Sequence, residues 1–326
     1  MGVRTVTGWI RPEDMGITTA HEHIFINLTA FFTEHPVPYI EDPATAEVRM
    51  DRLGILNRDP YALKDNLFYN DFETQKKELM YFKAAGGRTV VDATSRGIDR
   101  RPGDLKRMAE ETGLNVIMGA GYYVYSTHPK GLLERPVGDV AGEIIRELND
   151  GVGDTGIRAG FIGEIGISEL FHPSEEHVLR ASAIASKETG AAIHVHINPW
   201  QTFGLKAVKI LLDEGVSPDR ICIDHVDVVS QEDYIIKLVD QGVSVEFDNF
   251  GKEYFVNQEV RNDGYGNFIR DTERVQIIRS LVEKGYGKQI LLSNDVCLKT
   301  LLHTYGGWGY DHLLSNMILQ GLTLCL

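Results

Sequence analysis

The chain has 326 residues, of which 43% are hydrophobic and 25% charged, and its formal net charge is −14. This composition is typical of a globular protein with a sizeable core, and the length suits one barrel domain over residues 1–326. The negative charge argues against nucleic acid or an anionic membrane as a partner. Three cysteines without close pairing disfavour a disulfide scaffold, and the first residues lack an apolar stretch of signal-peptide length, so we expect a cytoplasmic protein.

Eight short runs rich in strand-forming residues follow one another, and most precede an amphipathic segment. They cover residues 17–23, 88–94, 115–123, 159–167, 191–197, 221–227, 243–250 and 289–295. The near-continuous apolar character of several runs indicates strands buried on both faces, as in a parallel sheet. Helices are expected over 71–86, 102–113, 137–150, 174–190, 204–215, 230–242 and 270–285. This alternation predicts an α/β fold of the (β/α)8 TIM barrel type.

The longest interruption, residues 24–87, lies between the first two predicted strands and contains several aromatic residues. We expect this insertion either to cover the pocket or to plug one end of the barrel. A Rossmann-like open sheet is the rival architecture. The GxGxxG match at Gly151, Gly153 and Gly156 does not support it, because the match follows a predicted helix and precedes no helix start. We therefore interpret that segment as a loop.

Metal-binding residue types stand near the polar ends of the predicted strands. His21 and His23 alternate in the first run, and residues i and i+2 of a strand share a face, so both can converge on one point inside the barrel. Two imidazoles suit Zn²⁺ or a similar ion, although an isolated HxH pair is as typical of a structural role. Barrel active sites lie at the C-terminal ends of the strands, which favours the metal-binding interpretation.

Glu164 interrupts an apolar run, where an unpaired carboxylate would cost several kcal/mol. Its partner is either an arginine or lysine from a neighbouring strand, or two cations with one at each oxygen. His194 and His196 share a face of their strand by the same alternation. We take His196, which lies nearer the catalytic end, as the metal ligand and His194 as a deeper residue. The alternative is that His194 is the ligand.

His225 and Asp295 are the candidate catalytic residues. His225 has Asp224 and Asp227 as neighbours, either of which could orient its ring, and its alternative role is that of a core histidine. Asp295 ends the last predicted strand. Its carboxylate can bind a metal and accept a proton, or else cap the segment that follows.

These motifs resemble those of the phosphotriesterase family of the amidohydrolase superfamily. The resemblance runs from GWIRPEDMGITTAHEH through DHVD to LLSNDVCLKTLLHTYGGWGY, nearly the whole chain. It implies a site for two divalent ions, for which Zn²⁺ is favoured and Mn²⁺ or Co²⁺ are alternatives. The implied ligands are His21, His23 and Asp295 for the more buried ion, His196 and His225 for the more exposed one, and Glu164 as the bridge. Many relatives have a carboxylated lysine where this chain has Glu164.

The reaction implied by the resemblance is hydrolysis of a carboxylic ester or lactone by a bridging hydroxide, with a phosphoester as the alternative. Asp295 would accept the proton, and His225 or Asp227 would help to relay it. The expected substrate contacts are Tyr123, Asp248, Lys252 and Lys299. The segment FDNFGKEYF lacks the arginine that acyl-homoserine lactonases of this family carry after the seventh strand, which weakens that assignment.

Two other classes stay open. A binding protein could keep the barrel and the metals without turnover, whereas a Schiff-base aldolase would need a lysine in the predicted barrel strands, which contain none. We expect a small-molecule substrate, no nucleic acid or membrane partner, and we allow for a homodimer. The segment after GYDHLL is shorter than in relatives of the resembled family, so we expect exposed apolar surface near the barrel or altered oligomerisation.

Overall fold

Eight parallel strands form the core of the molecule, in the spatial order β12-β11-β10-β9-β8-β7-β6-β3. The computed structural model describes residues 2–254 and 267–317. The strands are β3 (Ile17–Glu22), β6 (Gly87–Asp92), β7 (Asn115–Ala120), β8 (Phe161–Ile167), β9 (Ile193–Ile197), β10 (Ile221–Ile223), β11 (Ser244–Phe247) and β12 (Ile290–Leu292). Beyond β12, the Asp295 amide donates to the His21 carbonyl at 3.1 Å and so brings the last strand to the first. The predicted TIM barrel is confirmed.

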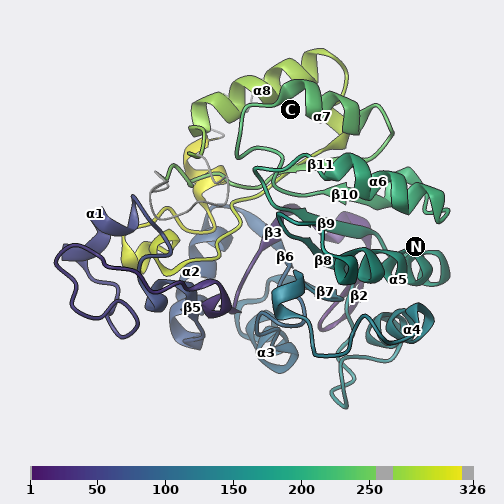
Figure 1. The fold of residues 1–326 in the computed structure, drawn as a ribbon, viewed down its shortest axis with the longest axis horizontal. Helices are drawn as coiled ribbons and strands as arrows, with labels where there is room; N and C mark the ends of the chain where they lie inside the picture. Colours follow the sequence, from purple (N-terminus) through teal and green to yellow (C-terminus); the bar gives the residue numbers. More distant parts are fainter. Residues whose placement is uncertain (1, 255–266, 318–326) are drawn as a thin grey trace.

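In the part of the chain that the structure describes, seven helices surround the strands, and Figure 1 shows α4 to α8 following one another around the outside. They are α2 (Phe72–Ala84), α3 (Pro102–Thr112), α4 (Val137–Asn149), α5 (Pro173–Thr189), α6 (Gly204–Asp213), α7 (Glu232–Val239) and α8 (Asp271–Glu283). Capping residues explain several ends. The Asp71 carboxylate accepts from the Thr74 amide at 2.7 Å at the start of α2, and Gly113 ends α3 with a φ of 68°, which favours glycine.

The insertion between β3 and β6 covers the catalytic end of the barrel. It contains the short helix α1 (Leu53–Leu56) and strand β4 (Ile26–Asn27), which pairs antiparallel with β5 (Phe68–Tyr69). Phe31 and Tyr61 of this segment line the cavity described below. Of the two roles expected for the insertion, covering the pocket is therefore the one observed.

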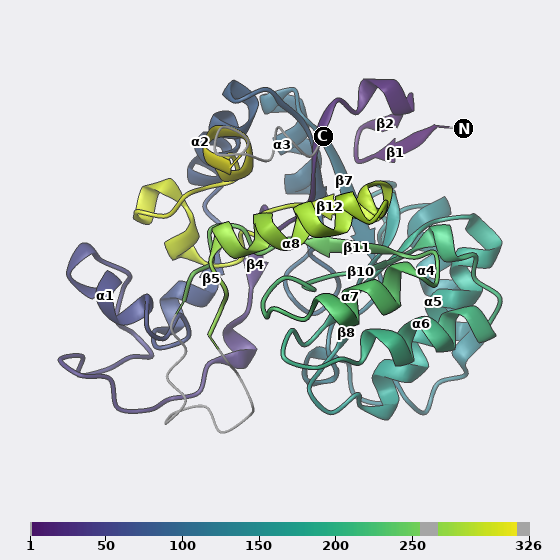
Figure 2. The same cartoon turned by 90° about the horizontal axis from the view of Figure 1, so that it is seen from above.

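A hairpin that the sequence pattern did not predict lies at the other end of the barrel. Its strands are β1 (Val3–Thr5) and β2 (Gly8–Ile10), and the Val6 amide donates to the Val116 carbonyl near the start of β7 at 2.9 Å. Figure 2 shows the hairpin and α1 on opposite sides of the molecule. The insertion and the hairpin thus cover different ends of the strands.

Two strands end earlier than predicted at positions that matter for the site, and this places two site residues beyond the strands. Strand β10 ends at Ile223 and β12 at Leu292, whereas the predicted strands extended to 227 and 295. His225 and Asp295 then adopt φ angles of 61° and 45°, in the left-handed region that non-glycine residues rarely occupy. Such conformations persist where the surrounding structure enforces them, often at functional sites.

The remaining sequence expectations concern loops and ends. The segment with Gly151, Gly153 and Gly156 forms turns after α4, as expected of a loop. Within residues 2–254 and 267–317, no helix is both long and apolar enough to span a bilayer. The expectation about the chain end falls largely on residues 318–326, which lie outside the described residues.

A buried ion pair should contribute strongly to stability. The guanidinium of Arg274, which is fully buried, donates to Asp227 at 3.0 Å, to Asp271 at 2.7 Å and to the Lys252 carbonyl at 3.1 Å. Replacing it leaves two carboxylates without their cation, so Arg274→Met should lower the free energy of unfolding by about 3–5 kcal/mol in urea titrations. Arg279→Met, at an exposed position of the same helix, should change it by less than about 0.5 kcal/mol. Equal effects of the two variants would contradict this role for Arg274.

Candidate metal centre

The six predicted ligands converge at the C-terminal ends of the barrel strands. His21 lies in β3 and His23 directly after it, Glu164 in β8 and His196 in β9. The other two, His225 and Asp295, stand on the turns after β10 and β12. Two overlapping combinations of their ligand atoms could hold an ion: His21 with His23 and Asp295, and His21 with Glu164 and His225. His196 belongs to neither combination.

Glu164 lies between two groups of imidazoles. Its Oε1 is 3.5 Å from His23 Nε2, while its Oε2 is 3.1 Å from His196 Nδ1 and 3.5 Å from His225 Nε2. Burial raises the pKa of the Glu164 carboxyl, but His21 and the other facing imidazoles outweigh burial and hold the pKa well below its usual range. Among the described residues no arginine or lysine pairs with this carboxylate, so the groups that face its two oxygens are imidazoles.

Asp295 faces the first-strand histidines on one side and Lys252 on the other. Its Oδ1 is 3.2 Å from His23 Nε2 and 3.9 Å from His21 Nε2, and its Oδ2 pairs with Lys252 Nζ. Burial raises the pKa of the Asp295 carboxyl, but the Lys252 ammonium and the two imidazoles outweigh burial and hold the pKa well below its usual range. The carboxylate is therefore ionised and available as a ligand or a proton acceptor.

Three of the histidines are oriented through the nitrogen that faces away from the centre. His21 Nδ1 is 3.0 Å from Glu246 Oε2, and His225 Nδ1 is 3.0 Å from Asp248 Oδ1. His23 Nδ1 is 2.9 Å from Thr94 Oγ1. An acceptor at Nδ1 holds the proton there and leaves the Nε2 lone pair for a metal, the usual arrangement of metal-binding histidines.

The residue that orients His225 is not one of those predicted. Asp227 bonds Asn249 and Arg274, and Asp224 points into the barrel interior, whereas Asp248 binds both the ring and the backbone amide of His225. The prediction of Asp224 or Asp227 was wrong because the left-handed turn at His225 directs its ring toward β11.

Glu246 was missed by the sequence reasoning, although a signal was present. It is a fully buried carboxylate inside the apolar run VSVEF, the same signal that identified Glu164 in FIGEIG. Its Oε2 holds the ring of His21, so Glu246 is as closely linked to the centre as Asp248 is.

His196 rather than His194 reaches the centre. His196 Nδ1 is 2.8 Å from His225 Nε2, and His196 lines the cavity. His194 lies one layer deeper, with Nδ1 3.3 Å from Glu246 Oε1. This geometry supports the assignment of His196 as the ligand.

A cavity of about 360 Å³ opens above the centre, and the four predicted substrate contacts differ in their relation to it. Tyr123 and Lys252 line the cavity, and Tyr123 Oη is 3.3 Å from His196 Nδ1. Asp248 is fully buried against His225, and Lys299 pairs with Asp65 at 2.5 Å. Among the described residues, the cavity wall includes neither Asp248 nor Lys299, so the predicted substrate contacts of these two residues gain no support.

The residues present fit a pair of divalent ions. His21 Nε2 is buried and makes no hydrogen bond. It points toward Glu164 and Asp295. Burial lowers the pKa of the His21 imidazole, but Glu164 and Glu246 outweigh burial and raise the pKa to about 9, so the surroundings favour positive charge at this nitrogen. Imidazole nitrogens and carboxylate oxygens are ligands that Zn²⁺ and similar ions accept.

A TIM barrel with a histidine and carboxylate cluster at its C-terminal end defines a class of metal-dependent hydrolases. The model of the phosphotriesterase family matches residues 1–324. The chain belongs to this family, whose members are binuclear metal-dependent hydrolases, as the sequence resemblance predicted.

Similar proteins cover nearly the whole chain. The N-acetyltaurine hydrolase of Xenopus tropicalis is 34% identical over 321 residues, 97% of this chain and 90% of the relative. The human N-acetyltaurine hydrolase is 33% identical over 330 residues, covering 98% and 93%. A resiniferatoxin-binding protein from Rhodobacter sphaeroides has a TM-score of 0.94 at 32% identity and covers 100% of this chain and 90% of its own. The Escherichia coli phosphotriesterase homology protein, solved with phosphate in its active site, has a TM-score of 0.76 at 29% identity and covers 94% and 91%.

Removal of the central carboxylate should empty the metal centre. Glu164→Ala should remove one or both ions of this centre and so lower the bound metal by about one to two ions per chain, because the residue faces both ligand groups. Elemental analysis of protein purified without chelator measures this content. Glu169→Ala removes another carboxylate of the cavity wall and should leave the content unchanged. Equal metal content in both variants would contradict the bridging position of Glu164.

Loss of the carboxylate behind His225 should weaken metal binding without abolishing it. Asp248→Asn keeps the shape of the side chain but removes its charge, so metal affinity should fall about 10- to 100-fold in chelator competition. The matched control is Asp233→Asn, at an exposed position of α7. An affinity of Asp248→Asn equal to that of the control would show that Asp248 does not orient the ligand.

Proposed function

We propose that this protein is a binuclear metal-dependent hydrolase that cleaves the amide bond of small, negatively charged N-acyl amines. The observation that carries the metal-dependent part is the placement of Glu164, with one oxygen toward His23 and the other toward His196 and His225. The substrate class rests on the N-acetyltaurine hydrolases, which are 33–34% identical over 97–98% of the chain. The ester or lactone predicted from the sequence gains no support from these relatives, since N-acetyltaurine is an amide.

Two divalent ions in this centre would lower the pKa of a water molecule and polarise the substrate carbonyl. The side chains supply the rest of the mechanism. Asp295, kept ionised by Lys252, accepts the proton of the attacking water at its carboxylate. Hydrolysis of an amide also requires a proton on the departing nitrogen, since an amide anion is a poor leaving group. Asp295 can deliver that proton when the C–N bond breaks.

The anionic part of the substrate needs a positive group at the cavity wall. Among the described residues that line the cavity, Lys252 is the only lysine or arginine. Lys252, which pairs with Asp295, is therefore the group that would bind a sulfonate or carboxylate of the substrate. Tyr123, whose hydroxyl lies beside His196, is placed to donate to an oxygen of the substrate.

A second candidate function is binding without turnover. The solved structure with the TM-score of 0.94 is named for binding resiniferatoxin, not for an enzymatic activity. The metal centre would then have a structural role. The ionised Asp295, which is placed to accept a proton at the centre, favours the enzyme.

The direct test of the proposed function is turnover by the metal-loaded protein. We expect release of acetate from N-acetyltaurine, and slower or no hydrolysis of lactones and phosphotriesters in the same assay. Removal of the metal by a chelator should abolish the reaction, and Zn²⁺, Mn²⁺ or Co²⁺ should restore it. Full metal occupancy without turnover of any of these substrates would favour the binding protein instead.

The loss of kcat caused by replacing Asp295 should depend on whether the leaving group needs a proton. With metal content matched, Asp295→Asn should lower kcat for an N-acetyl amine by about 10²- to 10⁴-fold, the usual contribution of proton transfer. An acetate ester of an acidic phenol leaves without a proton, so its hydrolysis should fall less. Equal losses for the amide and the ester would contradict proton delivery by Asp295.

Charge recognition by Lys252 can be separated from its contact with Asp295. Lys252→Met should lower kcat/KM for N-acetyltaurine about 10- to 100-fold more than for an uncharged N-acetyl amine, because one charged hydrogen bond is lost. Lys299→Met tests the other predicted lysine. A preference for the charged amide that survives Lys252→Met but not Lys299→Met would transfer the role to Lys299.

A further inference from the structure

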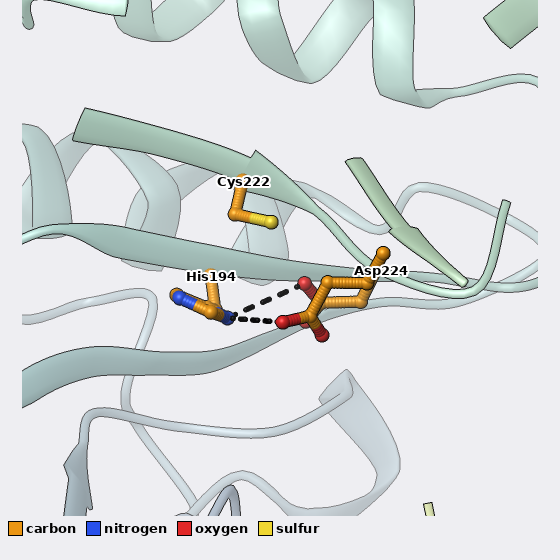
Figure 3. Close-up of side chains that lie close together, drawn as sticks. His194, Cys222 and Asp224 are labelled. Carbon is orange, nitrogen blue, oxygen red and sulfur yellow. Dashed lines mark ion pairs between the residues drawn. The ribbon is translucent and has the colours of Figure 1, made fainter. Parts of the chain in front are cut away.

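A second group of metal-binding side chains lies in the barrel interior, one layer below the centre described above. Its four members come from three adjacent strand regions: His194 on β9, Cys222 on β10, Asp224 just after β10, and Glu246 on β11. One ligand atom from each lies within 4.8 Å of all the others. Figure 3 shows the imidazole of His194 and the carboxylate of Asp224 pointing toward one another, with Cys222 nearby.

The polar atoms of this group lack hydrogen-bond partners. Both oxygens of Asp224, Oε1 of Glu246 and Nδ1 of His194 are buried and make no hydrogen bond of good geometry, so their nearest polar neighbours are one another. Asp224 is only 1% exposed, and Glu246 is fully buried. Buried carboxylates without partners are costly, and buried charges are normally paired or coordinate a metal. Four such atoms that face one another indicate that a cation could lie between them and bind all of them.

Two of the distances between these atoms match those expected in tetrahedral coordination. Ligands at about 2.0–2.3 Å from a Zn²⁺ ion lie roughly 3.3–3.8 Å from each other. His194 Nδ1 is 3.3 Å from Glu246 Oε1 and 3.6 Å from Asp224 Oδ1. A thiolate from Cys222 would complete a closed set of four protein ligands, which is typical of structural zinc sites rather than catalytic ones.

Charge also favours a cation at this position. Asp224, Glu246 and Asp248 all lie within 3.7 Å of His21 Nδ1, so three carboxylates surround one imidazole. No lysine or arginine forms an ion pair with Asp224 or Glu246 among the residues that the structure describes. A divalent ion would balance two of these charges, and deprotonation of Cys222 on binding would supply its fourth ligand.

We propose that the protein binds a third divalent cation of the zinc type, held by His194, Cys222, Asp224 and Glu246 inside the barrel. The site is structural, because the ligand set leaves no position for a substrate. It is joined to the catalytic centre by Glu246, whose Oε1 faces the third cation while its Oε2 orients His21. The proposal does not depend on which substrate is hydrolysed.

Cobalt provides a test that separates this site from the catalytic centre, whose predicted ligands include no cysteine. The Co²⁺-loaded full-length protein should contain about three ions per chain and show a near-ultraviolet charge-transfer band from a thiolate bound to cobalt. Cys222→Ala should remove the band and one ion. Cys297→Ala, which removes the other described cysteine, should leave the band in place.

The outcomes distinguish this proposal from the catalytic centre. One bound cobalt with the band would support the interior site even if the binuclear centre failed to load. No band in the wild-type protein, or a band that depends on Cys297, would overturn the proposal. If Cys222→Ala does not fold, Asp224→Asn keeps the side-chain volume and should still lower the content by one ion. Unchanged content in that variant would also overturn it.

Discussion

Negative charge buried inside the barrel is the constraint on which the site depends. Glu164 and Glu246 are almost completely withdrawn from water, and a carboxylate in such surroundings must be matched by positive charge or by hydrogen bonds. Elsewhere in the fold the same problem is solved by Arg274, which pairs with Asp227 and Asp271. At the strand ends, imidazoles rather than an arginine face the buried carboxylates, and an imidazole can exchange a proton for a metal ion.

The centre is built in two layers that have different tasks. The upper layer, with His23 and His196, faces the cavity and the insertion that covers it. The lower layer, with Glu246 and Asp248, is supplied by β11 and the residue that follows it, and holds the imidazoles of His21 and His225 in place. Because the lower layer belongs to the packed interior, the orientation of the ligands is fixed by the barrel rather than by the segments that connect its strands and helices.

The site residues that could be predicted from the sequence are polar or charged residues within otherwise apolar strands. Glu164 and the HxH pair stand out in apolar strands, and strand and helix alternation defined the barrel. The partner of His225 could not be predicted, because a left-handed turn directs the ring away from its neighbours in sequence. Glu246 carried the same signal as Glu164 but was not recognised. Substrate preference depends on side chains from the insertion and several loops, whose relative positions no local pattern specifies.

The left-handed conformations of His225 and Asp295 have a consequence for how the protein matures. Each costs of order 1–3 kcal/mol in backbone energy, and without metal the clustered ligands gain little in return. Metal binding favours the folded chain only, so its free energy adds to the stability of the native state. The supply of divalent ions during synthesis should therefore set how much of the chain reaches its native form and escapes proteolysis.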